Sequence, residues 1–269
     1  MKYIKVIIIL FCLIIISCND NPVVIQQSNT PVYNKIFSLS NDTVKYELWS
    51  ATGTQLYYGY NDLGIKVFLN GVEQKTGTVK FEPRMTHFIG TYAHGTPAKQ
   101  SFYYNSQKGF FTGYASFIMV SDTFSIWLAD FSIDKRYRIK DSIFNVVPNS
   151  SHKIIAWPNI PDEYIYYISL IAPFDPVKGL NDFSVVMSRA HNDSNFTEVD
   201  SAQIFIRTLI EATGQTSNNN VNPVWIGEGK YKGVINMPNT GTWSVFDSVI
   251  YQGILKTNVP SPKFTFTIP

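Results

Sequence analysis

The chain has 269 residues, of which 22 are basic, 20 are acidic and 15% are aromatic. Leaving out Lys2 and Lys5, which lie in a separate N-terminal segment, 20 basic and 20 acidic residues remain. This balance excludes the basic footprint of a nucleic-acid-binding protein and a polybasic membrane patch. No nucleic-acid partner is therefore expected.

The first 17 residues predict a secretion signal. Lys2 and Lys5 precede an apolar run over 6–16 that is shorter than the ~20 residues of a membrane-spanning helix. The run ends in Ser17-Cys18, which resembles the lipobox of bacterial lipoproteins. That resemblance implies cleavage before Cys18 and a lipid anchor on its sulfur, with enough acyl chains for stable membrane attachment. The alternative is that Cys18, like Cys12, is an ordinary apolar residue of the signal.

Residues 18–35 lack hydrophobic periodicity and predict a lipidated, flexible tether. From Val44 onward, short runs rich in Val, Ile, Phe, Tyr and Thr are separated by Gly, Asn and Pro, which is typical of β-strands. The dipeptide Asn70-Gly71 predicts a tight hairpin turn between two of them. The runs are 45–49, 65–69, 79–82, 100–104, 114–119 and 123–131. About seven strands in roughly a hundred residues favour an immunoglobulin-like β-sandwich.

Four landmarks of this region occur twice in the same order, which indicates an internal repeat. They are Gly-x-Asn-Asp at 59–62 and 179–182, an aromatic-x-Gly at 111–113 and 231–233, Trp127 and Trp243, and the segments 141–148 and 262–269. We therefore expect an all-β fold of two tandem immunoglobulin-like β-sandwiches, 36–148 and 160–269, joined by a linker over 149–159.

The repeated landmarks have structural explanations. Trp127 and Trp243 lie among alternating apolar residues and are expected to anchor the two cores. The Asn-Asp pairs are expected to close turns through side-chain to main-chain hydrogen bonds; calcium binding by Asp62 or Asp182 is the alternative. His152 and His191 have no obvious partners and are expected to be solvated.

The second copy also resembles a known family. Its motifs follow the order G-x-N-x-F, A-x-V-x-V, G-x-Y-x-G-x-[VI]-x-[FM] and G-x-W-x-V, at 179–183, 202–206, 229–237 and 241–245. This order looks like the YtkA-like and FixH-like family of small extracytoplasmic β-sandwich domains, over most of 164–269 and more faintly over 46–148. The resemblance implies a membrane-associated, non-catalytic part in copper handling or oxidase maturation.

One group of residues in the first copy predicts a metal site. Met85 and His87 are two positions apart, so they share a face of an extended strand, and His94 follows across a short loop. Thioether and imidazole ligands suit copper, and Met119 is a candidate fourth ligand. The second copy has no histidine in the segment 207–211 that we align with 84–87, so a single site is expected. The alternative is a structural or recognition loop without metal, with Met119 in the core.

No motif of a hydrolase, metalloprotease or phosphate-binding enzyme is present in the sequence, so we do not expect an enzyme. The predicted function is that of a lipid-anchored extracytoplasmic binding protein, copper-handling through its first domain. The alternative is a structural or recognition module that binds protein or polysaccharide without metal. Both place the chain in the cell envelope, facing the periplasm or the cell surface, with an envelope protein as a candidate partner.

Overall fold

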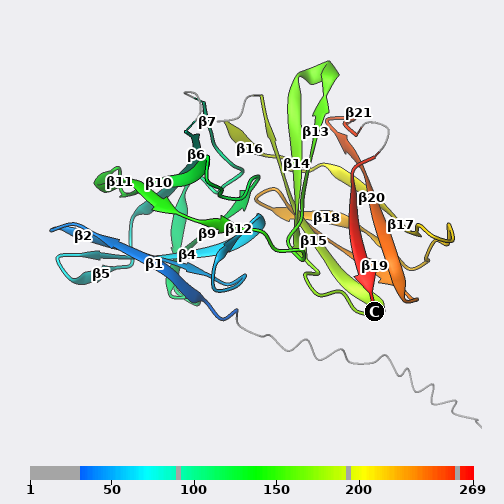
Figure 1. The fold of residues 1–269 in the computed structure, drawn as a ribbon, viewed down its shortest axis with the longest axis horizontal. Coiled ribbons are helices and arrows are strands. Elements are labelled where there is room, and N and C mark those ends of the chain that lie inside the picture. The colour runs from blue at the N-terminus through cyan, green and yellow to red at the C-terminus, as the bar shows by residue number, and fades with distance from the viewer. Residues whose placement is uncertain (1–30, 89–91, 192–194, 258–260) are drawn as a thin grey trace, which may run out of the picture. The chain divides into compact units, whose positions relative to one another are not determined.

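The computed structural model describes residues 31–88, 92–191, 195–257 and 261–269. Residues Val32–Pro269 form one compact unit, whose strands are labelled in Figure 1. It contains two large hydrophobic cores. In the described ranges the only helix is a single 3-10 turn, η1 (Ile160–Asp162), and no helix there could cross a membrane. The predicted all-β fold is confirmed.

The first sandwich is built around one antiparallel sheet in the order β1-β2-β4-β9-β8-β6-β10-β11. Strand β5 pairs with β4, β7 pairs with β6, and β3 and β12 form a short parallel pair. The strands are β1 (Asn34–Ser40), β2 (Val44–Ser50), β3 (Leu56–Tyr57), β4 (Gly59–Leu69), β5 (Val72–Gln74), β6 (Thr78–His87), β7 (Ala93–His94), β8 (Phe102–Asn105), β9 (Phe110–Phe117), β10 (Ser125–Ile133), β11 (Arg136–Phe144) and β12 (Val146–Val147).

The second sandwich has two separate sheets, in the orders β13-β14-β15-β19-β18 and β17-β20-β21. Strand β16 pairs with β15, and β22 pairs with β20. The strands are β13 (Ile154–Asn159), β14 (Tyr164–Ala172), β15 (Gly179–Ala190), β16 (Phe196–Glu198), β17 (Gln203–Ile210), β18 (Val221–Gly227), β19 (Lys230–Met237), β20 (Gly241–Tyr251), β21 (Ile254–Leu255) and β22 (Lys263–Ile268).

Both copies have the strand order of an immunoglobulin domain, in which four strands ABED face three strands CFG. In the first copy the ABED strands are β2-β4-β9-β8 and the CFG strands are β6-β10-β11. In the second they are β14-β15-β19-β18 and β17-β20-β22. In the first copy β8 also pairs with β6 and so joins the two sheets.

Strand β18 forms an edge of its sheet, and its pairing with β19 is irregular. The register shifts between Val221 and Val224, on either side of Pro223. A side chain at Gly233 on β19 would place its Cβ only 2.4 Å from the Val221 carbonyl oxygen, so this close approach requires glycine.

The two repeated tryptophans lie at the centres of the two cores. Trp127 on β10 and Trp243 on β20 are fully buried. The Trp127 Nε1–H donates to the Met119 carbonyl oxygen at 3.0 Å, and the Trp243 Nε1–H donates to that of Asn239 at 2.9 Å. Each indole is therefore both packed and hydrogen-bonded, and the prediction that the tryptophans anchor the cores is confirmed.

The repeated Gly-x-Asn-Asp closes the same turn in both copies. The Asn61 side chain accepts from the Tyr57 N–H at 2.9 Å and donates to the carbonyls of Tyr57 and Gly59. Asn181 makes the equivalent three bonds to residues 177 and 179. Gly59 has a φ of 85°, in the left-handed region that favours glycine. The turn-closing role is confirmed for the asparagine.

The two aspartates that follow these asparagines have different partners. Asp62 accepts from the Tyr33 hydroxyl at 3.2 Å and pairs with Lys108 at 3.5 Å, whereas Asp182 pairs with Lys232 at 3.1 Å.

The strand register corrects one of the alignments between the copies. Trp127 lies opposite Met85 on β6, and Trp243 lies opposite Ile210 on β17. Met85 is therefore equivalent to Ile210, whereas the sequence alignment paired it with Thr208. A shift of two residues leaves every side chain on the same face of a strand, so alternation alone could not detect the error.

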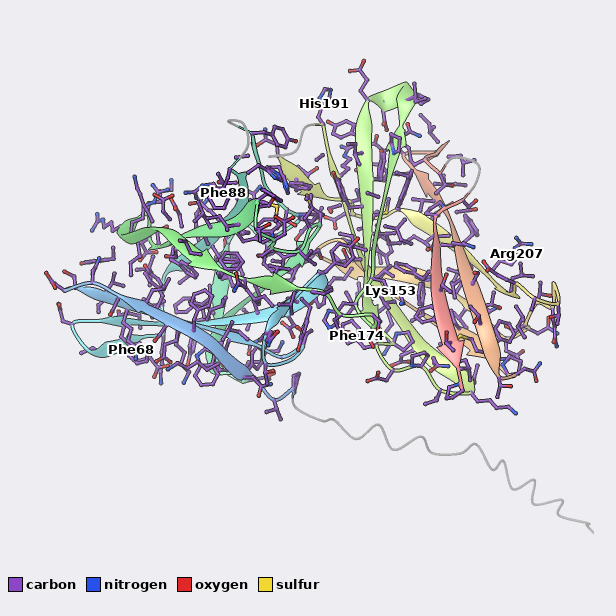
Figure 2. All side chains as sticks on the ribbon, viewed as in Figure 1. Phe68, Phe88, Lys153, Phe174, His191 and Arg207 are labelled. Atoms are coloured by element: carbon purple, nitrogen blue, oxygen red, sulfur yellow. The ribbon has the colours of Figure 1, made fainter. Side chains whose placement is uncertain are left out.

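Part of the expected linker is a strand, because residues 154–159 form β13 and pair with β14. His152, just before it, was expected to be solvated, and this was wrong. Its ring is 5% exposed, is stacked on Phe174 with centroids 4.2 Å apart, and its Nδ1 lies 3.0 Å from the Tyr60 carbonyl oxygen (Figure 2 labels Phe174). Burial lowers the pKa of His152. His191 is exposed, as expected, beside Glu163.

Candidate functional site

Three strands of the first sandwich bring the predicted ligands together. Met85 on β6 lies directly opposite His94 on β7 and Trp127 on β10. Two positions further along β6, His87 lies opposite Ser125 on β10. The main-chain N–H of His87 donates to the Tyr92 carbonyl oxygen at 3.3 Å. Residues opposite one another in an antiparallel sheet share a face, as do residues i and i+2. Met85, His87 and His94 therefore lie on one face, as the spacing predicted.

His94 has an unused ring nitrogen. Its Nδ1 lies 2.8 Å from the Gly95 carbonyl oxygen, which can only accept, so Nδ1 carries the proton and Nε2 presents a lone pair. Nε2 is buried and has no hydrogen-bond partner among the described residues, and the residue is 5% exposed. Burial lowers the pKa of His94; the bond to the Gly95 carbonyl opposes this, and the neighbouring His87 lowers the pKa further, so the net shift is downward. The ring is therefore neutral at pH 7.

His87 lies at the edge of the same group. Its Nδ1 is 2.7 Å from the Ser125 hydroxyl, which leaves Nε2 for another partner. The ring centroids of His87 and His94 are 5.5 Å apart. A metal ion bound by one nitrogen of each ring would lie about 3.2 Å from each ring centroid. With a tetrahedral N–metal–N angle, the two centroids would then be about 5.2 Å apart. The observed spacing suits a two-histidine site.

Met85 belongs to the hydrophobic core. Its side chain is fully buried in the cluster around Trp127, which is the place that Ile210 occupies in the second copy. The predicted strand over 79–82 extends in the structure to His87, so Met85 lies within β6.

Met119 lies elsewhere. It is 38% exposed and lines a hollow of about 600 Å³ together with Tyr58 and His152, so it is neither a core residue like Met237 nor part of the histidine group. Within the described residues, no three His, Cys, Asp or Glu side chains are grouped as metal ligands. Cys18, the expected lipidation site, lies outside the described residues.

An exposed aromatic patch adjoins the histidines, and its residues were not singled out in the sequence. Phe88, Tyr92 and Phe124 are 61%, 52% and 59% exposed. The Phe88 N–H donates to the Phe124 carbonyl oxygen at 2.8 Å, so these two residues lie side by side (Figure 2 labels Phe88). Tyr92 packs against both histidines, with centroids 5.8 and 6.0 Å away. By strand register Tyr92 shares the face of His87, whereas Phe88 and Phe124 share the opposite face, so the three residues lie at the same strand ends but on both sides of them. We call these three residues the aromatic tip.

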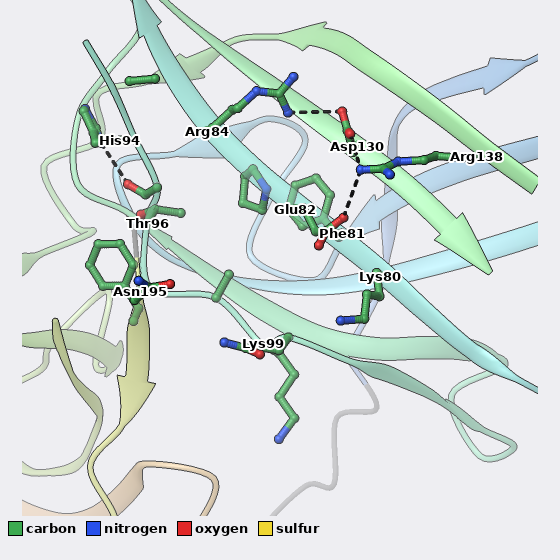
Figure 3. Close-up of a pocket in the computed structure, with 16 residues that line it drawn as sticks. Lys80, Phe81, Glu82, Arg84, His94, Thr96, Lys99, Asp130, Arg138 and Asn195 are labelled. Carbon is green, nitrogen blue, oxygen red and sulfur yellow. Dashed lines mark hydrogen bonds and ion pairs between the residues drawn. The ribbon is translucent and has the colours of Figure 1, made fainter. Parts of the chain in front are cut away.

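A charged groove lies over the outward face of β6, β10 and β11 (Figure 3). Asp130 accepts from Arg84 at 3.1 Å, from Arg138 at 2.7 Å and from the Asp141 N–H at 3.0 Å. Burial raises the pKa of Asp130, but these bonds outweigh it and hold the pKa below its usual value. Glu82 faces Asp130 across the strands, and the Arg138 guanidinium lies between them, 3.7 Å from Glu82. The groove therefore presents fixed donors and acceptors.

No family model matches the sequence, and no curated protein matches it. Solved structures similar to it include the Escherichia coli adhesin FdeC, at 11% identity and a TM-score of 0.25, with 87% of this chain and 66% of that chain covered. The Yersinia pseudotuberculosis adhesin InvE is 8% identical with a TM-score of 0.24, over 80% of this chain and 56% of that one. Domains 5-6 of the S-layer protein SbsC are 11% identical with a TM-score of 0.26, over 88% and 98%.

The chain thus spans less than two thirds of the length of FdeC and InvE. Likenesses this distant do not bear on the ligand of this chain. The resemblance to the YtkA-like and FixH-like domains stays a prediction.

Proposed function

We propose that the chain is a non-catalytic recognition protein of the cell envelope, held to a membrane by lipid on Cys18, with the aromatic tip as its contact surface. The observation that carries this proposal is the exposure of three aromatic rings on adjoining strand ends. Large exposed apolar groups that lie together on a soluble domain mark contact sites for a partner. The partner is an envelope protein or polysaccharide.

The energetics favour such a contact. Burying an exposed phenylalanine completely is worth ~1.5–3 kcal/mol. Since Phe88, Tyr92 and Phe124 expose 52–61% of their surfaces, covering each gains about 1–2 kcal/mol. The main-chain bond between Phe88 and Phe124 already fixes their backbones, so only the side chains have to be ordered on binding.

The test is binding of the purified protein to isolated envelope fractions, with polysaccharide and protein separated. The double variant Phe88→Ser/Phe124→Ser is expected to lose at least tenfold in affinity. Phe205→Ser is the matched control, since Phe205 is a similarly exposed ring on β17 of the second sandwich. Equal losses in both variants would argue against a specific role of the aromatic tip.

The anchor is tested separately in cells. The variant Cys18→Ala is expected to leave the membrane pellet while still being exported. A variant that is exported and cleaved but stays in the pellet would exclude the lipid anchor.

A second candidate function is copper binding by His87 and His94, and the observation that favours it is the buried, unpartnered Nε2 of His94. A ligating histidine usually donates its other ring N–H to an acceptor, as His94 does to the Gly95 carbonyl. The Met85 thioether, on the same face, is the nearest soft donor by strand register and would favour Cu(I). Met119 is left out of this set because it lines a separate hollow.

Titration of the whole chain with Cu(I) and with Cu(II) tests this candidate. One ion per chain is expected, with affinity falling below pH ~6.5 because imidazole must be neutral to ligate. His87→Ala should weaken binding at least tenfold, whereas the control His191→Ala, an exposed histidine of the second sandwich, should not. An unchanged affinity in His87→Ala would exclude the site.

A further inference from the structure

The charged groove belongs to a longer depression. Its main hollow has a volume of about 480 Å³, within the ~300–1,000 Å³ range of small-molecule sites. It shares Lys99 and Gln100 with a second hollow of about 360 Å³ that is lined by Tyr103, and it shares Lys80 with a third of about 480 Å³. The three adjoin one another along residues 96–103, so they form one elongated groove.

Opposite charges balance within this groove. Lys80, Glu82 and Arg84 project from one face of β6, and Arg138 and Asp130 lie beside them. Lys99, towards the second hollow, is paired with Glu228 at 3.0 Å and Glu198 at 3.6 Å. Since Arg84, Lys99 and Arg138 each have a carboxylate partner, a strongly anionic ligand would meet these carboxylates and a strongly cationic ligand the basic groups.

The polar groups of the groove that are not used in ion pairs include both hydrogen-bond donors and hydrogen-bond acceptors. A guanidinium has five N–H donors, and Arg138 uses only its Nη2 in the ion pairs with Glu82 and Asp130. Glu82, half-exposed, presents acceptor oxygens, and Lys80 and Gln100 line the same hollow. Hydroxyl groups donate and accept at once, so a chain of vicinal hydroxyls matches this alternation.

Tyr103 adds a flat apolar surface. Its side chain is 60% exposed and lines the second hollow. An exposed aromatic ring of this kind can pack by dispersion against the C–H face of a sugar ring, while the hydroxyls at the sugar's edge reach polar neighbours.

We propose that this groove binds a neutral oligosaccharide, with Tyr103 packing against one sugar ring and Lys80, Glu82 and Arg138 hydrogen-bonding hydroxyls of the next. The site is distinct from the aromatic tip; His94 also lines the main hollow, but the proposal does not use the histidine pair. It stands or falls independently of both.

The test uses the whole chain and an array of neutral gluco-, galacto- and mannohexaoses, with hexagalacturonate and hexaglutamate as acidic probes. Binding of at least one neutral hexasaccharide is expected, with hexagalacturonate and hexaglutamate at least tenfold weaker. Tyr103→Ala and Glu82→Ala should each weaken that binding tenfold or more. Both side chains point outward, and unchanged thermal unfolding of the variants establishes that they fold.

The matched controls are Phe205→Ala, an exposed ring, and Lys178→Ala, an exposed charge, both on the second sandwich; neither should change the affinity. The proposal is overturned by binding to none of the neutral hexasaccharides, by equal or tighter binding of an acidic probe, or by full affinity in Tyr103→Ala. Preferential capture of hexaglutamate would instead indicate a peptide groove.

Discussion

Asp247 is a carboxyl group inside the second hydrophobic core, and its replacement by asparagine should stabilise the protein. It lies on β20 between the buried Val245 and Val249, opposite Ile206 of β17. Both carboxyl oxygens are buried and have no hydrogen-bond partner among the described residues. Burial raises the pKa of Asp247 well above its ordinary value.

The size of the effect follows from proton linkage. The unfolded chain releases this proton near pH 3.9, whereas the folded chain retains it, so the folded state binds more protons and stability falls as pH rises above ~3.9. Each pH unit between the unfolded pKa and the folded pKa costs ~1.4 kcal/mol, so the cost at pH 7 is at most about 4 kcal/mol. Asp247→Asn keeps the size of the protonated acid and does not titrate, although its amide has two N–H donors where the acid has one O–H donor. Its gain in stability over the wild type should therefore grow as the pH rises above ~3.9 and should be small at pH 4.

Urea unfolding of the wild type and of Asp247→Asn between pH 4 and pH 7.5 measures this difference. Asp182→Asn is the control, because Asp182 is an exposed carboxyl paired with Lys232 and should show only a small, nearly constant effect. A difference between Asp247→Asn and the wild type that does not grow with pH would refute the reasoning, and so would a variant less stable at pH 7.

Three further predictions concern the folded cores. Trp243→Ala should cost ~3–5 kcal/mol in urea unfolding; a cost below 1 kcal/mol would contradict its anchoring role. Asn61→Ala should cost ~2–4 kcal/mol because it leaves the Tyr57 N–H and carbonyl without their bonds, while Asn61→Asp, which retains only the acceptor, should recover part of this. Because burial lowers the pKa of His152, its folded-state proton affinity is below that of the unfolded chain; stability should fall as pH drops below ~6.5, and His152→Phe should reduce that loss. An identical pH dependence in His152→Phe would contradict this.

Much of the fold was predictable because its signals are local. Alternation and turn residues located the strands, and the repeated Gly-x-Asn-Asp and Trp127 with Trp243 set the two copies in correspondence. Both motifs make local contacts. Each asparagine bonds to main-chain groups at most four residues away along the chain, and each indole fills the centre of its own sandwich.

The features that escaped prediction depend on distant contacts. His152 is buried by Tyr60 and Phe174, and no residue near it in the sequence indicates this burial. The sequence did place Met85, His87 and His94 together, since a two-residue spacing and a short return loop suffice for that. It did not show that Met85 is turned into the core, because the predicted strand ended at Glu82, whereas β6 runs to His87 and continues the inward face of Val79 and Phe81 through Met85.

The irregular edge strand β18 affects whether copies of the protein associate at high local concentration. Val221, Val224 and Ile226 are exposed there, a composition that in a flat strand would nucleate cross-β growth between neighbouring molecules. Pro223 interrupts the row of N–H donors in the middle of this segment, and the bulge around it bends the edge. A second chain can therefore cover these side chains but cannot extend a continuous ladder along them. Dense packing on a surface should then produce at most reversible pairs rather than fibres.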